Sequence, residues 1–208
     1  MSLRVVNLGL PKTGTTTLAR ALKMAGFKVA DHRVRPKQTD VKSLHNQYVA
    51  ELLYRGYFET GDPGAHLEPF ECVSEISLLR DGKSLWPQMD FGLIEAIRAH
   101  HPGVKFVASH RDPFELSQSM LAWSDLGVAR LPQSGIPGLP AGWGDTTKER
   151  EQWINAHYAH LRTLFRGRDD FLEYDVADPN ARDTLAAFLD VPLPWWGRAN
   201  RNTNKKAS

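Results

Sequence analysis

A short segment near the start of the chain combines a lysine, several hydroxyl side chains and two glycines. It runs from Gly9 to Thr17 and reads Gly-Leu-Pro-Lys-Thr-Gly-Thr-Thr-Thr. A loop of this kind before a helix gathers unpaired backbone N–H groups at the helix N-terminus, where the helix dipole also favours an anion. The hydroxyls and the Lys12 ammonium can add further donors. The segment therefore predicts a binding site for a phosphate-type group.

A second candidate anion site lies near residue 111. Arg111 follows an apolar stretch, and Ser119 lies two turns into the helix expected next. A guanidinium and a hydroxyl at this spacing can converge on one anion. Ser117 is a competing hydroxyl on the same helix. The expected apolar face of this helix, with Ser119 on its flank, consists of Leu116, Met120 and Trp123.

The elements that must position these residues alternate between strand and helix. Residues 3–8 form an apolar run typical of a buried parallel strand, and the residues after the loop repeat at helical spacing. Asp112 and Pro113 suit an N-cap and a first helical position. Further strands are expected over 28–32, 104–110 and 170–175, and residues 70–77 form either a short strand or an irregular segment. Further helices are expected over 40–57, 87–101, 147–165 and 178–189.

This order predicts an α/β fold. We expect three α/β/α layers around a central, mostly parallel sheet, similar to P-loop nucleoside triphosphate hydrolases. The 208 residues show no change in composition that calls for two units, so residues 1–208 are expected to form one domain. Two stretches stand apart within it. They are a Pro/Gly-rich loop at 131–144, either a lid over the acceptor pocket or a surface excursion, and a basic tail at 192–208.

The first loop departs from the nucleoside triphosphatase pattern G-x-x-x-x-G-K-[ST] at its lysine. Gly9 and Gly14 match the pattern, but Thr15 occupies the lysine position and Lys12 stands three residues earlier. Without that lysine and a clear Mg²⁺ site, phosphoryl transfer loses much of its charge stabilisation. Hydrolysis of ATP or GTP is therefore disfavoured, and a P-loop kinase or NTPase remains an alternative.

The segment from Pro11 to Thr16 resembles the 5′-phosphosulfate loop of the sulfotransferase family, which uses 3′-phosphoadenosine 5′-phosphosulfate (PAPS) as donor. Arg111 and Ser119 match, in type and spacing, the family signature that holds the 3′-phosphate. The resemblance implies in-line transfer of a sulfuryl group to a hydroxyl or amine, with 3′-phosphoadenosine 5′-phosphate (PAP) as product and no metal required. The donor-binding residues that it implies are Pro11, Lys12, Thr13, Gly14, Thr15, Thr16, Thr17, Arg111 and Ser119.

In this scheme Lys12 neutralises charge that develops on the bridging oxygen of the donor. A noncatalytic binder of 3′-phosphoadenosine nucleotides is a second alternative, because it would keep Arg111 and Ser119 without needing Lys12. The intact lysine favours the enzyme.

Catalysis also needs a general base for the acceptor. Asp31 and His32 end the second expected strand, where the carboxyl ends of parallel strands line a ligand crevice. His32 titrates in the useful range without help and is the first candidate. Asp31 can orient it or serve as the base, and Glu75 is the third candidate.

Composition limits the partners and the compartment. Apolar residues make up 41% and charged residues 24%, and Lys plus Arg exceed Asp plus Glu by only two, 26 against 24. This balance argues against a broad nucleic-acid or membrane surface. The single cysteine, Cys72, and the lack of a long apolar run favour a cytoplasmic protein. We expect a small-molecule or carbohydrate acceptor; Trp143, Trp195 and Trp196 suggest an aromatic or sugar face.

Overall fold

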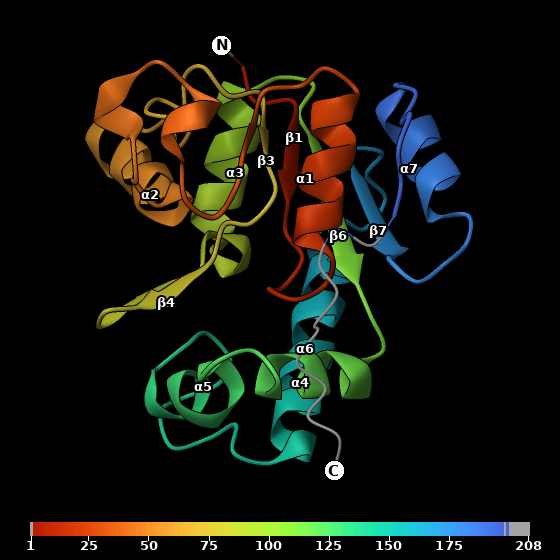
Figure 1. Cartoon of the computed structure of the whole chain (residues 1–208). Coiled ribbons are helices and arrows are strands. Elements are labelled where there is room, and N and C mark those ends of the chain that lie inside the picture. Colours follow the sequence, from red (N-terminus) through yellow and green to blue (C-terminus); the bar gives the residue numbers. More distant parts are fainter. Residues whose placement is uncertain (1, 198, 200–208) are drawn as a thin grey trace.

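A five-stranded parallel sheet forms the centre of the computed structural model, which describes residues 2–197 and 199 (Figure 1). The strand order is β2-β3-β1-β6-β7, and every neighbouring pair runs parallel. The strands are β1 (Val5–Asn7), β2 (Val29–Ala30), β3 (Cys72–Val73), β6 (Lys105–His110) and β7 (Phe171–Asp175). The α/β fold with a mostly parallel central sheet, predicted from the order of the elements, is confirmed.

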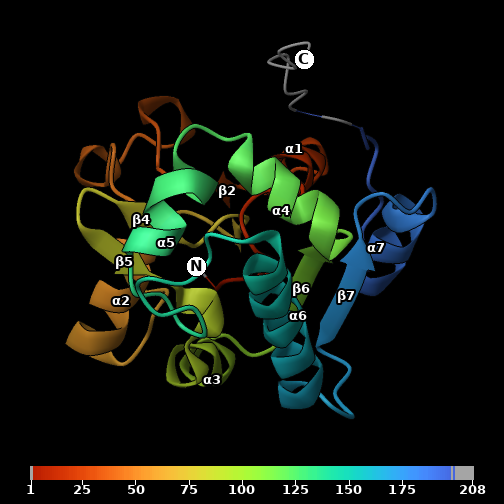
Figure 2. The same ribbon diagram turned by 90° about the horizontal axis from the view of Figure 1, so that it is seen from below.

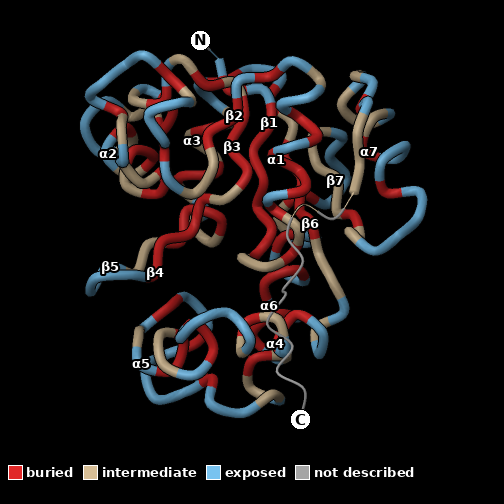
Figure 3. The backbone as a smooth tube through the Cα atoms, viewed as in Figure 1, coloured by how far each residue is buried: buried red, intermediate tan, exposed pale blue. Residues whose placement is uncertain are grey.

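Helices cover both faces of this sheet, because both faces of its strands are apolar. On β1, Val5 belongs to a buried cluster with residues of α1 (Thr15–Met24) and α7 (Ala181–Leu189). The next residue, Val6, belongs to the opposite cluster with residues of α2, α3 and α6. Successive side chains of a strand point to opposite faces, so the sheet separates two cores. Figure 3 shows the buried strands between the more exposed outer helices.

The helices of the second layer are α2 (Val49–Thr60), α3 (Phe91–His100) and α6 (Thr147–Leu164). Two further helices, α4 (Pro113–Leu121) and the short α5 (Leu131–Gln133), lie beyond the carboxyl ends of the strands (Figure 1). The view from below places α4 and α6 side by side there (Figure 2). As predicted, Asp112 caps α4: its carboxylate accepts from the Glu115 amide, and Pro113 is the first helical residue.

A two-stranded antiparallel hairpin was missing from the sequence-based prediction. It consists of β4 (Leu78–Arg80) and β5 (Lys83–Leu85) and projects from the main sheet. Asp81 and Gly82 both have positive φ at its turn, 54° and 75°. Asp-Gly is a preferred pair for such two-residue turns, so the signal was present in the sequence.

Several predicted helix boundaries were wrong. The helix expected over 40–57 begins only at Val49, because the chain first forms a 3₁₀ turn at Lys42–Leu44 and then turns back through Asn46, whose φ is 65°. The helix expected from residue 87 begins at Phe91, after a separate 3₁₀ turn at Pro87–Met89. The last helix starts at Ala181, since Asp178 instead accepts from the Asn180 amide in the preceding turn.

The Pro/Gly-rich stretch is more regular than expected. It starts with α5, which directly follows a π-helical turn at Leu126–Arg130, and the next residues double back in a bridge between Ile136 and Leu139. Trp153 of α6 donates to the Pro137 carbonyl over 2.9 Å. The stretch is thus fastened to α6 along much of its length. No helix within the described residues is long and apolar enough to cross a membrane.

Candidate functional site

The loop between β1 and α1 is held by hydrogen bonds from α6. The Leu10 amide donates to the Tyr158 hydroxyl (3.3 Å), which in turn donates to the Ser109 carbonyl at the end of β6 (2.8 Å). His157 Nε2 donates to the Leu8 carbonyl over 2.8 Å. Tyr158 thereby joins the loop to β6 and fixes its height above the sheet.

Two glycines permit the close approach that this loop requires. A Cβ at Gly9 would lie 2.5 Å from the Ser109 carbonyl oxygen. A Cβ at Gly14 would lie 2.5 Å from Cγ2 of Val176, and its φ of 97° disfavours other residues. Gly14 is also the N-cap of α1 and has no side chain to cap the helix. No side chain of the described residues caps this end of α1, and the N-terminus of a helix favours an anion.

Lys12 lies within this loop in a left-handed conformation, with φ of 75°. Its Nζ lies 3.5 Å from the centre of the Trp123 ring. Burial lowers the pKa of Lys12, the charge of Glu75 raises it, and the charge of Arg111 lowers it. The three charged residues predicted from separate parts of the chain thus lie near enough to influence one another.

Glu75 follows β3 and faces the start of α1. Burial raises its pKa, against the lowering effects of a Ser77 hydrogen bond, the nearby His32 and a Thr15 hydrogen bond. The Ser77 hydroxyl donates to Glu75 Oε1 over 2.5 Å. Since Glu75 acts on Lys12 and bonds Thr15, it is placed at the loop itself.

His32 lies next to Glu75 and shares Ser77 with it. The Ser77 carbonyl is 2.9 Å from His32 Nδ1, and a carbonyl can only accept, so Nδ1 carries the proton. In the neutral ring Nε2 is then left as an acceptor. The His32 ring also lies against Tyr48, with 5.2 Å between ring centres.

Asp31 is engaged elsewhere. It forms an ion pair of 2.7 Å with Lys23 of α1 and accepts from Ser74 Oγ over 3.1 Å and from Gln38 Nε2 over 3.3 Å. These contacts tie the end of β2 to α1 and β3. The Asp31 carboxylate is thus already engaged by three donors.

Arg111 and Ser119 lie on the other side of the loop. Arg111 follows β6, pairs with Glu115 over 3.2 Å and influences the Lys12 pKa. Ser119 is half-buried on α4, and its hydroxyl makes no hydrogen bond within the part of the chain that the structure describes. Ser117 is buried and accepts from Arg150 Nε over 2.9 Å. Of the two serines, Ser119 has the hydroxyl left for a ligand.

The four threonines of the loop differ in their surroundings. Thr13 is buried; its hydroxyl donates to the Leu10 carbonyl over 2.7 Å and lies 2.8 Å from the Ser109 hydroxyl. Thr17 is also buried and donates to the Gly197 carbonyl over 2.9 Å. Thr15 bonds Glu75, and Thr16 is exposed. Of the four, Thr13, Thr15 and Thr17 are thus buried and bonded within the protein, and Thr16 is exposed at the start of the helix.

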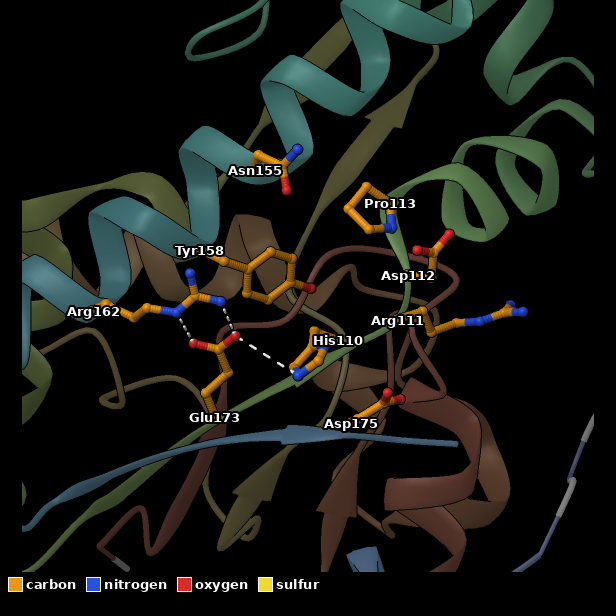
Figure 4. A pocket seen from close by; sticks show the side chains of 9 residues that line it. All are labelled: His110, Arg111, Asp112, Pro113, Asn155, Tyr158, Arg162, Glu173 and Asp175. Carbon is orange, nitrogen blue, oxygen red and sulfur yellow. Dashed lines mark hydrogen bonds and ion pairs between the residues drawn. The ribbon is translucent and has the colours of Figure 1, made fainter. Parts of the chain in front are cut away.

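A separate cavity of about 300 Å³ lies behind Arg111, between α6 and the ends of β6 and β7 (Figure 4). Arg162 binds both carboxylate oxygens of Glu173 there, at 2.7 and 2.5 Å, and His110 lies 3.7 Å from the same carboxylate. Figure 4 shows the Arg111 side chain pointing away from this pair. Arg111 thus lines the cavity but extends out of it.

Three tryptophans suggested as an acceptor face lie in different places. Trp195 stacks under Arg20 of α1, 4.3 Å from its guanidinium carbon, and Trp196 packs against Tyr174 with 6.1 Å between ring centres. Trp143 is 57% exposed. The basic residues of the tail, Arg198, Arg201, Lys205 and Lys206, lie outside the described residues.

A metal site is not apparent among the residues that the structure describes. No three His, Cys, Asp or Glu side chains converge there in a ligating arrangement. Cys72 is free and buried, and burial raises the pKa of its thiol to about 12. The positive groups at the loop are accordingly the side chains of Lys12 and Arg111 and the amides of α1.

The sequence matches a known protein family over the part of the chain that carries these residues. The family model described as a sulfotransferase domain matches residues 4–130, more than half of the chain and the part that contains Lys12, Glu75, Arg111 and Ser119. No protein of curated function matches the sequence. One similar solved structure is an unliganded sugar kinase from Janibacter sp. HTCC2649, with 14% identity and a TM-score of 0.46, covering 92% of this chain and 96% of the kinase chain.

Proposed function

The chain belongs to the sulfotransferase domain family, and we propose that it transfers a sulfuryl group from PAPS to a hydroxyl or amine of a small-molecule or carbohydrate acceptor. The donor would lie at the start of α1, with its 5′-phosphosulfate in the loop of residues 11–17 and its 3′-phosphate between Arg111 and Ser119. This proposal combines the family with the specific side chains that the fold brings together.

One observation carries the proposal. Lys12 and Arg111, 99 positions apart, lie close enough for the guanidinium to lower the pKa of the lysine. Two like charges held together beside uncapped helix amides are unfavourable alone and favourable around a polyanion. A nucleotide with phosphate groups at both the 5′ and 3′ positions supplies negative charge to each of them.

Each group then has a distinct task. Lys12 stabilises the negative charge that develops on the oxygen of the breaking S–O bond, while the amides and hydroxyls at the start of α1 orient the transferred group. The acceptor oxygen or nitrogen forms the new bond to sulfur and loses its proton to a base. The S–O bond to the donor breaks as the new bond forms, and its electron pair leaves with the 5′-phosphate of PAP.

Glu75 is the base that the geometry favours. It lies at the loop, bonds Thr15, and has a raised pKa, which makes its carboxylate a stronger base than an exposed one. His32, whose Nε2 is also an acceptor, lies next to Glu75 and is the second candidate. Asp31 ranks third because Lys23 already pairs with it.

The first test is calorimetric titration without metal. The protein is titrated with PAP and, separately, with ATP plus Mg²⁺; tight binding of PAP that weakens in Arg111→Ala supports the donor site. Arg162→Ala is the matched control, since Arg162 lines the same cavity but pairs with Glu173. A preference for Mg-ATP would overturn the proposal in favour of a kinase or NTPase.

The second test measures turnover. PAPS is incubated with the protein and with hydroxyl and amine acceptors, phenols and sugars included, and release of PAP is followed. Acceptor-dependent release supports the transferase. Binding of PAP without release in any acceptor class would instead identify a noncatalytic nucleotide-binding protein.

A further inference from the structure

Trp123 provides an aromatic face for the loop lysine. The residue lies two positions after the end of α4, and its amide donates to the Met120 carbonyl over 3.2 Å, so the last turn of the helix places it. Lys12 Nζ lies 3.5 Å from the centre of its ring. This distance is well within the range in which an ammonium is attracted by the negative face of an indole, the best of the aromatic rings for this contact.

The exposure of Trp123 shows that core packing does not explain its position. The helical spacing predicted that it would join Leu116 and Met120 on the buried face of α4. Those two side chains are fully buried, whereas Trp123 is 44% exposed. The half-exposed indole is therefore not a core side chain, and the Lys12 ammonium lies over its ring.

The backbone of Lys12 supports the same conclusion. Its φ of 75° is uncommon for a residue with a side chain and is maintained only when the surrounding structure requires it. The loop on either side is anchored by Leu10 to Tyr158 and by Thr13 to Ser109. The direction in which the Lys12 side chain leaves the loop is therefore fixed, and it leads onto Trp123.

The charges around Lys12 explain why such a face is useful. Loss of water and the nearby Arg111 both disfavour its protonated form, and Glu75 is the charged group that favours it. An aromatic face favours the charged form without introducing a carboxylate that would repel the donor.

We propose that Trp123 is a positioning residue for Lys12: its indole face holds the ammonium, protonated and in one orientation, at the mouth of the anion loop. The catalytic part of this inference rests on the proposed function, whereas the contact between the two side chains does not. Trp123 acts through Lys12 and is not itself assigned a contact with the reacting atoms.

The chain offers a conservative variant and a matched control. Trp123→Phe keeps an aromatic face of weaker attraction, and Trp123→Leu removes it. Phe114→Leu is the control, since Phe114 of α4 is similarly exposed and no cation lies over its ring among the described residues.

A readout independent of activity comes from NMR of protein with ¹³C-labelled lysine. The Lys12 side-chain resonance, identified by its loss in Lys12→Arg, is expected upfield because of the indole ring current. It should move to an ordinary position in Trp123→Leu and only part of the way in Trp123→Phe. Its titration midpoint should fall in Trp123→Leu, since the protonated form loses its support. An unchanged resonance would overturn the inference.

Kinetics test the consequence for turnover. In Trp123→Leu we expect kcat to fall about tenfold with KM for PAPS little changed. The alkaline limb of the pH profile, where Lys12 loses its proton, should also shift to lower pH. Trp123→Phe should recover part of kcat, and Phe114→Leu should match the unaltered protein. Equal kcat and pH profile in Trp123→Leu would refute the positioning role. If the unaltered protein transfers nothing from PAPS while the NMR shift is present, the proposed function fails and the contact stands.

Discussion

Arg150, although 1% exposed, donates a hydrogen bond of 2.9 Å from Nε to the hydroxyl of Ser117. The same guanidinium donates to the carbonyls of Gly144 and Asp145, at 2.6 and 2.8 Å. A buried cation is thus satisfied by neutral acceptors that join α4, α6 and the Pro/Gly-rich stretch. Ser117 belongs to this structural set, which separates it from Ser119 two residues later.

The first prediction compares these two serines. Ser119→Ala should weaken PAP binding roughly tenfold, the effect of losing one hydrogen bond to a charged group, with the free energy of unfolding unchanged. Ser117→Ala should lower the free energy of unfolding by about 1–3 kcal/mol, because it leaves a buried guanidinium donor unpaired, with PAP affinity unchanged. Calorimetry and urea denaturation measure the two quantities. The reverse assignment of effects would show that Ser117 is the ligand.

The second prediction concerns Lys12. Lys12→Ala should lower the rate of transfer from PAPS by about 10²- to 10³-fold, since a charge that stabilises the transition state is lost. PAP binding should remain measurable, because Arg111 and the amides of α1 are intact. Lys23→Ala serves as a control for charge: it removes a lysine of α1 whose partner is Asp31. Turnover in Lys12→Ala equal to that of the unaltered protein would contradict the mechanism.

The third prediction concerns Glu75. Glu75→Gln should lower turnover by about 10²- to 10⁴-fold, the range for loss of a general base. Because burial raises the pKa of Glu75, turnover of the unaltered protein should increase as pH rises through that raised pKa. Glu71→Gln is the matched control, as Glu71 pairs instead with Arg4 over 3.8 Å. If His32→Gln removes activity and Glu75→Gln retains it, His32 is the base.

The same substitution has a predicted effect on stability. The folded-state pKa of Glu75 lies above its ordinary value of 4.5, so ionisation is harder in the folded than in the unfolded chain. Below pH 4.5 Glu75 is protonated in both states and does not change the free energy of unfolding. As pH rises through the folded-state pKa, ionisation of the buried carboxyl lowers the free energy of unfolding by its full amount. Glu75→Gln should therefore stabilise the protein at neutral pH and leave it unchanged at low pH. Urea denaturation at both pH values measures this, and a gain at low pH would contradict it.

The fourth prediction uses His157. Burial lowers its pKa from 6.5 to about 4, in spite of the bond that its ring donates to Leu8. Its neutral form therefore supports the fold fully above pH 6.5, and this support is lost as pH falls toward 4. The loss should amount to about 3 kcal/mol. In His157→Gln, which keeps an N–H donor but does not titrate, the decline over this interval should flatten; equal slopes would show that other groups cause it.

Local signals predicted the parts of the fold that they determine. The apolar run before Gly9, the helical repeat after it and the Asp112-Pro113 cap each depend on neighbours within a few residues, and the structure has β1, α1 and α4 there. The helix expected from Asp40 failed because a pairing outside the local sequence decides its start: Tyr48 forms an isolated bridge with Arg33 and is itself extended, so the helix begins at Val49. The Asp81-Gly82 pair is a local signal for a hairpin turn, but the sequence-based prediction did not include this hairpin.

The candidate site likewise has residues that local patterns predict and contacts that depend on distant parts of the chain. The sequence alone predicted Lys12, Arg111 and Ser119 as site residues by type and spacing, and the structure places Arg111 near enough to Lys12 to lower the pKa of the lysine. It did not separate Ser117 from Ser119, because the deciding partner, Arg150, lies 33 positions away. Neither did it predict Trp123 at Lys12 or Ser77 between Glu75 and His32. These contacts depend on how α4 and β3 lie against the loop, which no local pattern encodes.

The support of the loop by α6 has a consequence for the order of assembly during synthesis. A nascent chain of 130 residues already carries Lys12, Glu75 and Arg111. It lacks the groups that bond Leu8 and Leu10, because His157 and Tyr158 have not yet been made. The loop is thus among the first parts of the site to leave the ribosome, but its hydrogen bonds to α6 can form only after a helix translated more than a hundred codons later has packed against it.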